Sequence, residues 1–146
     1  MSKIAFVTDS TAYLPAELAK KYNITITPQV LIWGEETFRD GVDIQPDEFY
    51  TRLKSSKSMP TTSQVPIVTM QAAFQELVDQ GFSVLGIFIS SKLSGTLQSA
   101  IQAKSMMGSA GEKVALVDSQ STAMGLGFQV LAAARAAEAG ASLQEC

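Results

Sequence analysis

Three unbroken apolar runs constrain the fold of this chain most, because each run ends abruptly in a short polar loop. The runs are residues 4–7, 84–89 and 114–117. Apolar residues elsewhere recur at helical spacing, over about 15–22, 70–78, 96–107 and 122–139. Apolar strands that alternate with amphipathic helices are typical of βαβ units. The sequence therefore predicts an α/β fold with a mainly parallel sheet flanked by helices.

The segment between the first two runs is less regular. Residues 24–33 are rich in β-branched side chains, but Pro28 cannot donate a hydrogen bond within a sheet, which places this strand at an edge or a bulge. A glycine turn leads to a short return strand at 37–39, and Pro46 begins another helix. Residues 55–66 are rich in hydroxyl side chains and are expected to form no regular element.

Composition excludes several classes of function. The chain of 146 residues has 11 basic and 14 acidic side chains, so it carries no excess positive charge for a nucleic acid or an anionic membrane surface. It contains no histidine, which excludes a Ser-His-Asp or Cys-His catalytic group and a histidine metal site. Its single cysteine, Cys146, forms neither an intrachain disulfide nor a Cys-x-x-Cys pair. We therefore expect no metal, no resident cofactor and no nucleic acid partner.

The two ends of the chain suggest its location and extent. The first apolar stretch, 4–7, is far shorter than a signal-peptide core or a membrane span of roughly 20 residues. We therefore expect a cytoplasmic protein with no stable membrane insertion. The length fits one domain, and residues 141–145 are typical of the N-cap and first turn of a further helix. The chain is thus expected to be truncated at its C-terminal end.

Short polar side chains follow each of the three apolar runs. They are Thr8 to Thr11, Ser90 to Thr96, and Asp118 with Ser119. In an open α/β sheet ligands bind beyond the carboxyl ends of the strands, so these loops and residues 60–64 are predicted to meet at one pocket. Ser94, Gly95 and Thr96 are the best-placed group for a carboxylate or phosphate, because they combine hydroxyl donors, close approach and a helix N-terminus. The loops supply no obvious general base, and Lys92 is their only cation.

Each loop taken alone is also typical of a purely structural role. Serine, threonine and aspartate before a helix are frequent N-caps, and the alternative for Asp9 and Asp118 is that they accept hydrogen bonds from nearby backbone N–H groups. Lys92 is equally typical of a solvated surface charge. Residues 40–43 lack the spacing of an EF-hand and are interpreted as a turn. The sequence contains no Walker motif or dinucleotide fingerprint.

A series of short motifs, taken in order along the chain, resembles the bacterial DegV family. They are Thr8-Asp9-Ser10-Thr11-Ala12 with Leu14-Pro15, Phe38-Arg39-Asp40-Gly41-Val42-Asp43-Ile44, Glu48-Phe49-Tyr50, Pro60-Thr61-Thr62-Ser63-Gln64, Ile89-Ser90-Ser91-Lys92-Leu93-Ser94-Gly95-Thr96 with Gln98-Ser99-Ala100, and Val117-Asp118-Ser119. The resemblance implies that residues 1–146 are the N-terminal, fatty-acid-binding domain of a two-domain α/β protein, without its second domain. It further implies a non-catalytic protein that presents a bound acyl chain to a separate fatty acid kinase, which phosphorylates the carboxylate.

The same resemblance assigns the site residues. In the family, the carboxylate is held by hydroxyls of the Pro-Thr-Thr-Ser-Gln and Leu-Ser-Gly-Thr motifs, which fall at Thr62 and Ser94 in this sequence. Family members also use basic and histidine residues of the second domain near the head group. The weaker candidates for the fatty acid site are Ser63, Gly95, Thr96, Ser10 and Ser119.

The physical roles of tail and head group differ for a ligand such as palmitate. Burying about 15 methylene and methyl groups at roughly 0.8 kcal/mol each gives a gross driving force of about 12 kcal/mol. A charge-assisted hydrogen bond contributes only about 1.5–3 kcal/mol. We therefore expect the tail to set the affinity, while Thr62 and Ser94 set the orientation and exclude neutral lipids.

Two other classes of function stay open on the sequence alone. The first is a phosphotransferase-type enzyme domain that acts on a small phosphorylated metabolite, because helix N-termini bind phosphate as readily as carboxylate. The second is a structural or interaction domain whose polar loops are only caps and turns. The absence of histidine and of a Walker motif disfavours the enzyme.

Overall fold

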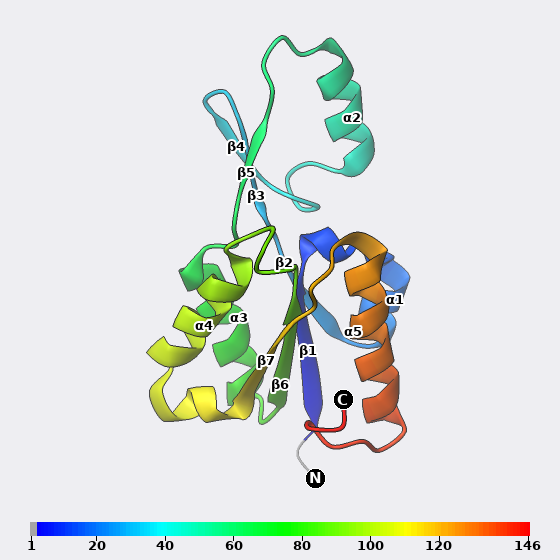
Figure 1. The fold of residues 1–146 in the computed structure, drawn as a ribbon, viewed down its shortest axis with the longest axis vertical. Helices are drawn as coiled ribbons and strands as arrows, with labels where there is room; N and C mark the ends of the chain where they lie inside the picture. Colours follow the sequence, from blue (N-terminus) through cyan, green and yellow to red (C-terminus); the bar gives the residue numbers. More distant parts are fainter. Residues whose placement is uncertain (1–2) are drawn as a thin grey trace.

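The three apolar runs form neighbouring strands of one parallel sheet, as the sequence predicts. The computed structural model describes residues 3–146. Over this part of the chain the sheet consists of β1 (Ile4–Asp9), β2 (Ile24–Thr27), β6 (Ser83–Phe88) and β7 (Val114–Asp118). Their order is β2-β1-β6-β7, and every pair is parallel. The polar loops that follow β1, β6 and β7 therefore start from the same edge of the sheet (Figure 1).

Helices cover both faces of this sheet, because successive residues of a buried strand point to opposite sides. In β1, Phe6 packs among residues of α1 and α5, whereas Val7 packs among residues of α3 and α4. Figure 1 shows these two helix pairs on opposite sides of the sheet. Their bounds are Ala16–Lys21 for α1, Ile67–Asp79 for α3, Thr96–Met106 for α4 and Ala123–Glu138 for α5. Burial on both faces explains why the central strands are continuous apolar runs.

A small lobe projects beyond the carboxyl edge of the parallel sheet (Figure 1). It consists of β3 (Val30–Trp33), β4 (Glu36–Arg39), α2 (Pro46–Ser55) and β5 (Thr61–Ser63). Its strands form an antiparallel sheet in the order β4-β3-β5. The lobe has a core of its own, in which Leu31, Trp33 and Ile44 are buried with Phe38, Phe49 and Leu53 packed against them.

Two features of the lobe differ from what the sequence predicts. The strand expected over 24–33 is in fact two strands in two different sheets, because Pro28 lies between the end of β2 and the start of β3. The expectation that residues 55–66 form no regular element is wrong for β5, which pairs with β3. Its three residues are polar and exposed, so the strand has no apolar alternation and depends on its partner.

Arg52 ties the elements of the lobe together. Its guanidinium carbon lies 4.6 Å from the centroid of the Trp33 ring and 5.4 Å from that of Phe38, and the guanidinium also forms an ion pair with Glu36. The Trp33 indole N–H donates to the Ser56 hydroxyl at 3.0 Å. Because these contacts join α2 and the residue after it to β3 and β4, the lobe packs as one unit.

The stretch 40–43 is a turn, as the sequence analysis concluded. The Arg39 guanidinium forms an ion pair with Asp43 at 2.8 Å, and the Arg39 backbone N–H donates to the same carboxylate at 2.8 Å. These hydrogen bonds lower the pKa of Asp43 to about 2. The Asp43 carboxylate is therefore engaged by arginine, and residues 3–146 contain no cluster of acidic or cysteine side chains that would hold a metal ion.

Candidate functional site

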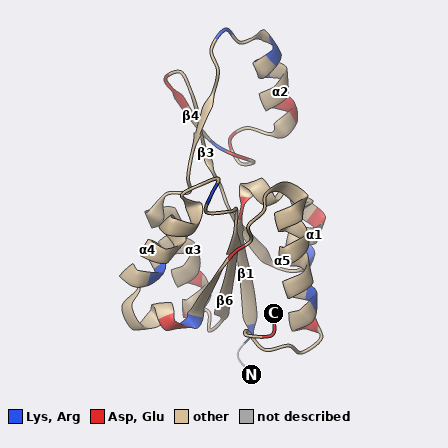
Figure 2. Cartoon of the chain, in the orientation of Figure 1, with Lys and Arg blue, Asp and Glu red and all other residues tan. Residues whose placement is uncertain are grey.

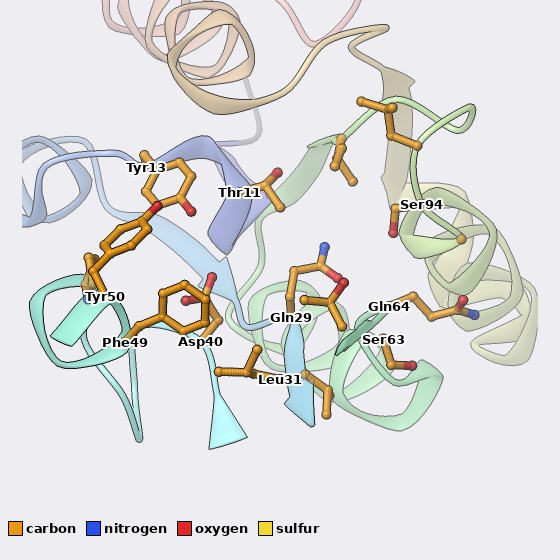
Figure 3. A pocket seen from close by; sticks show the side chains of 16 residues that line it. Thr11, Tyr13, Gln29, Leu31, Asp40, Phe49, Tyr50, Ser63, Gln64 and Ser94 are labelled. Atoms are coloured by element: carbon orange, nitrogen blue, oxygen red, sulfur yellow. The ribbon is translucent and has the colours of Figure 1, made fainter. Parts of the chain in front are cut away.

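A cavity of about 430 Å³ lies at the junction between the lobe and the carboxyl edge of the parallel sheet. The loops after β1 and β6, the link between β2 and β3, and parts of β3, β5 and α2 form its walls (Figure 3). The strands β1 and β6 are neighbours in the sheet, yet the chain leaves β1 for β2 on the other side. The cavity thus occupies a topological switch point, where open α/β sheets bind ligands, and its volume is typical of a small-molecule site.

One end of the cavity is lined by uncharged hydrogen-bond donors. Ser94 and Gly95 precede α4, and Ser63 and Gln64 lie at the end of β5 (Figure 3). Thr62 pairs with Leu31 across the lobe sheet, and cross-strand partners point to the same face, so Thr62 shares the face on which Leu31 borders the cavity.

Gly95 has a steric role at this end. A Cβ atom at this position would collide with the side chain of Gln64. The glycine therefore lets Gln64 fold over the start of α4, where its amide donates to the Ser99 hydroxyl at 3.4 Å. The close approach predicted at Gly95 is made in this structure by a side chain of the protein itself.

The other end of the cavity is aromatic. Tyr13, Phe49 and Tyr50 gather there around Asp40 (Figure 3). The rings of Phe49 and Tyr50 meet edge to face with centroids 5.1 Å apart, and Phe49 also meets Trp33 of the lobe core at 5.4 Å. Burial raises the pKa of the Tyr13 phenol, and the Asp40 carboxylate raises it further, so Tyr13 stays protonated at neutral pH.

The electrostatics of the cavity are set by few charges. Lysine and arginine are spread over the helices and loops of both parts of the molecule (Figure 2), and none of the described residues that line the cavity is basic. The half-buried Asp40 is the one ionisable carboxyl among these lining residues. Asp40 therefore disfavours an anion at the aromatic end, whereas the hydroxyl and amide groups at the opposite end are able to donate hydrogen bonds to one.

The structure brings together four of the seven residues that the sequence analysis nominated. Thr62, Ser63, Ser94 and Gly95 all line the cavity. The other three are not among the lining residues, and each is engaged elsewhere. Thr96 is fully buried and bonds to Gln29, Ser10 accepts from the Gln29 backbone N–H at 3.0 Å, and Ser119 accepts from the Ser121 backbone N–H at 3.1 Å.

Asp9 and Asp118 both accept hydrogen bonds from backbone N–H groups, which confirms the alternative that their role is structural. Asp9 accepts from the N–H of Thr11 at 3.0 Å and from that of Ile89 at 2.8 Å, and this joins the loops after β1 and β6. Asp118 accepts from the Ser91 hydroxyl and from the N–H of Gln120, and both hydrogen bonds lower its pKa. The loop after β7 is therefore hydrogen-bonded to the loop after β6 and does not line the cavity.

Several lining residues were not anticipated as site residues. Gln29 follows Pro28 in the link between the two sheets, and a polar side chain that is 7% exposed is the type of residue that marks a site. Phe49 and Tyr50 belong to the Glu48-Phe49-Tyr50 motif of the family resemblance, but no site role was assigned to them. Tyr13 adopts φ of 50°, a left-handed conformation for which tyrosine has no preference, so no local pattern predicts the position of its ring.

The sequence of the chain matches one known protein family over nearly its whole length. A family described as "Uncharacterised protein, DegV family" matches residues 3–146. The chain belongs to the DegV family. Among curated DegV relatives, a DegV domain-containing protein of Clostridium perfringens is 37% identical over 145 residues, which is 99% of this chain and 51% of that protein. Protein DegV of Bacillus subtilis is 38% identical over 142 residues, 97% of this chain and 50% of that protein. The chain thus spans about half the length of these relatives.

Solved DegV structures share the fold. A DegV family protein from Thermus thermophilus, described for its fatty acid binding, has a TM-score of 0.88 and 33% identity over 97% of this chain and 50% of its own. A stearic acid-binding protein from Eubacterium ventriosum has a TM-score of 0.89 and 32% identity over 99% of this chain and 50% of its own. The α/β fold and the family resemblance that the motifs indicated are both confirmed.

Within residues 3–146, no helix combines the length and the apolar character needed to cross a membrane.

Proposed function

We propose that this chain is a non-catalytic, cytoplasmic fatty-acid-binding domain that holds a long-chain acid in the cavity beneath the lobe. The observation that carries the proposal is the polarity of the cavity, which has uncharged donors at one end and aromatic rings at the other. Relatives from Thermus thermophilus and Eubacterium ventriosum, each above 30% identical, are described as binding a fatty acid and stearic acid. The proposed carboxylate ligands are Thr62 and Ser94, with Ser63 and Gly95 beside them.

The chemistry of the donor end favours a carboxylate over a phosphate ester. Hydroxyl and amide groups suffice to satisfy a single negative charge, whereas a phosphate dianion is usually met by arginine or lysine. None of the described lining residues is a lysine or arginine. The phosphotransferase alternative therefore finds little support in the composition of the cavity walls.

The accessibility of the donor end supports a role in presenting the acid to another protein. Thr62, Ser63 and Gln64 are all exposed, and Ser94 is partly so. A carboxylate held there stays within reach of a second protein. We propose that this partner is a fatty acid kinase, as the family resemblance implies, and that the second domain of full-length members completes the surroundings of the head group.

Extraction of the purified chain tests the proposed ligand without any guess about its identity. Organic extraction followed by mass spectrometry should release about one long-chain fatty acid per chain, and the Thr62→Ala/Ser94→Ala double variant should release much less, because its head-group donors are gone. Thr61→Ala, on the same strand but outside the cavity lining, is the matched control. Absence of any fatty acid from both this chain and a full-length version would contradict the proposal.

A further inference from the structure

A series of hydrogen-bonded polar side chains connects the link between the two sheets with the start of α4. Gln29 and Thr96 are 67 residues apart in sequence, yet the Gln29 amide Nε2 donates to the Thr96 hydroxyl at 2.8 Å. Both side chains are buried, with exposed fractions of 7% and 0%. The Thr96 hydroxyl lies 3.0 Å from the Ser94 hydroxyl, which borders the cavity. In Figure 3 Gln29 lies between the aromatic end and Ser94.

The number of donors and acceptors at Thr96 favours one direction for these hydrogen bonds. A threonine hydroxyl has two acceptor sites and one hydrogen. Thr96 accepts from Gln29 Nε2 and from the Val65 backbone N–H at 3.4 Å, so both acceptor sites are occupied. Its hydrogen is left to donate, and Ser94 Oγ at 3.0 Å is a nearer acceptor than Gln29 Oε1 at 3.2 Å.

The Ser94 hydroxyl consequently has one hydrogen-bonding group left to use, which is its own hydrogen. Its oxygen accepts from the Thr96 hydroxyl at 3.0 Å and from the Thr96 backbone N–H at 3.2 Å. With both acceptor sites used, the hydrogen of the Ser94 hydroxyl is the group that remains available to a ligand in the cavity, which Ser94 lines. Hydrogen bonds that run in one direction polarise one another, which strengthens the last donor of the series.

We infer that Gln29 and Thr96 are positioning residues that hold Ser94 as a hydrogen-bond donor and thereby select ligands with an ionised, acceptor-only head group. This inference rests on the proposed function and refines its specificity. A carboxylate meets the polarised donor with a charge-assisted hydrogen bond. A primary alcohol of the same chain length buries the same tail but brings no charge, so it gains less from the ordered donor. Thr96, nominated above as a direct ligand, acts instead through Ser94.

The test compares two ligands on four versions of the protein. Equilibrium dialysis with radiolabelled palmitate and 1-hexadecanol gives the ratio of their affinities for the unmodified chain, Thr96→Val, Thr96→Ser and Gln29→Leu/Thr96→Val. Thr96→Val should lower the preference for palmitate by up to about tenfold, the limit set by complete loss of the charge-assisted hydrogen bond from Ser94, with little change for hexadecanol. Thr96→Ser keeps the hydroxyl and should restore the preference. The double variant removes the side-chain amide that Thr96→Val would leave buried and unpaired, so it keeps the test decisive if Thr96→Val unfolds.

The possible outcomes separate this inference from the proposed function. If the unmodified chain binds palmitate and Gln29→Leu/Thr96→Val retains its full preference, the positioning role is wrong while the proposed function stands. An equal loss of both ligands in that variant, with no restoration in Thr96→Ser, also overturns the positioning role, because it shows a structural effect only. If the unmodified chain binds neither ligand, the proposed function fails and the inference with it.

Discussion

Replacing Phe74 with alanine is expected to lower the free energy of unfolding by about 3–5 kcal/mol. Phe74 is fully buried in α3, and its ring lies 6.4 Å from that of Phe88, centroid to centroid. The ring fills the space between α3 and the parallel sheet, so its removal leaves a cavity that the rigid sheet cannot close. Urea denaturation followed by far-UV circular dichroism measures the change. Since natural domains are stable by only about 5–15 kcal/mol, this variant should be close to unfolding.

The matched control for Phe74 lies on the same helix. Val68 is 70% exposed, so Val68→Ala should change the free energy of unfolding by less than about 0.5 kcal/mol. A small loss in Phe74→Ala, comparable to that of the control, would show that α3 does not pack on the sheet as described.

The second large effect concerns the head group of the bound acid. Thr62→Ala and Ser94→Ala should each weaken palmitate binding by about tenfold, and the double variant should weaken it further, because each removes a donor to a charged acceptor. The affinity for 1-hexadecanol should change far less, since the tail contacts are unaltered. Equilibrium dialysis with both ligands gives the two values for each variant.

The control for this pair is Thr61→Ala, which changes an exposed hydroxyl of β5 that does not line the cavity. Its palmitate affinity should match that of the unmodified chain. Unchanged palmitate affinity in the Thr62→Ala/Ser94→Ala variant would remove both residues from the proposed site.

The parallel sheet could be predicted from the sequence because its signal is local. The runs 4–7 and 84–89 are covered on both faces of the sheet, so nearly every residue in them is buried and apolar. The lobe could not be predicted as fully, because β5 consists of Thr61, Thr62 and Ser63, which carry no apolar pattern. Their strand conformation comes from pairing with β3 some thirty residues earlier.

For the site, too, local motifs could be predicted from the sequence, whereas contacts between residues distant in sequence could not. The motif residues Thr62 and Ser94 could be nominated from sequence, and both line the cavity. The contact between Gln29 and Thr96 joins positions 67 residues apart and leaves no trace in either local sequence. The capping role of Asp9 was foreseen for its own loop, whereas its second hydrogen bond, to the N–H of Ile89, depends on the neighbouring strand.

The position of a bound head group tests the central claim most directly. A crystal structure of the chain with 2-bromohexadecanoic acid would locate the carbon next to the carboxylate by the anomalous signal of bromine. The proposed function predicts a bromine peak at the donor end, with carboxylate oxygens within hydrogen-bonding distance of the hydroxyls of Thr62 and Ser94. A peak at the aromatic end beside Asp40, or outside the cavity, would contradict it.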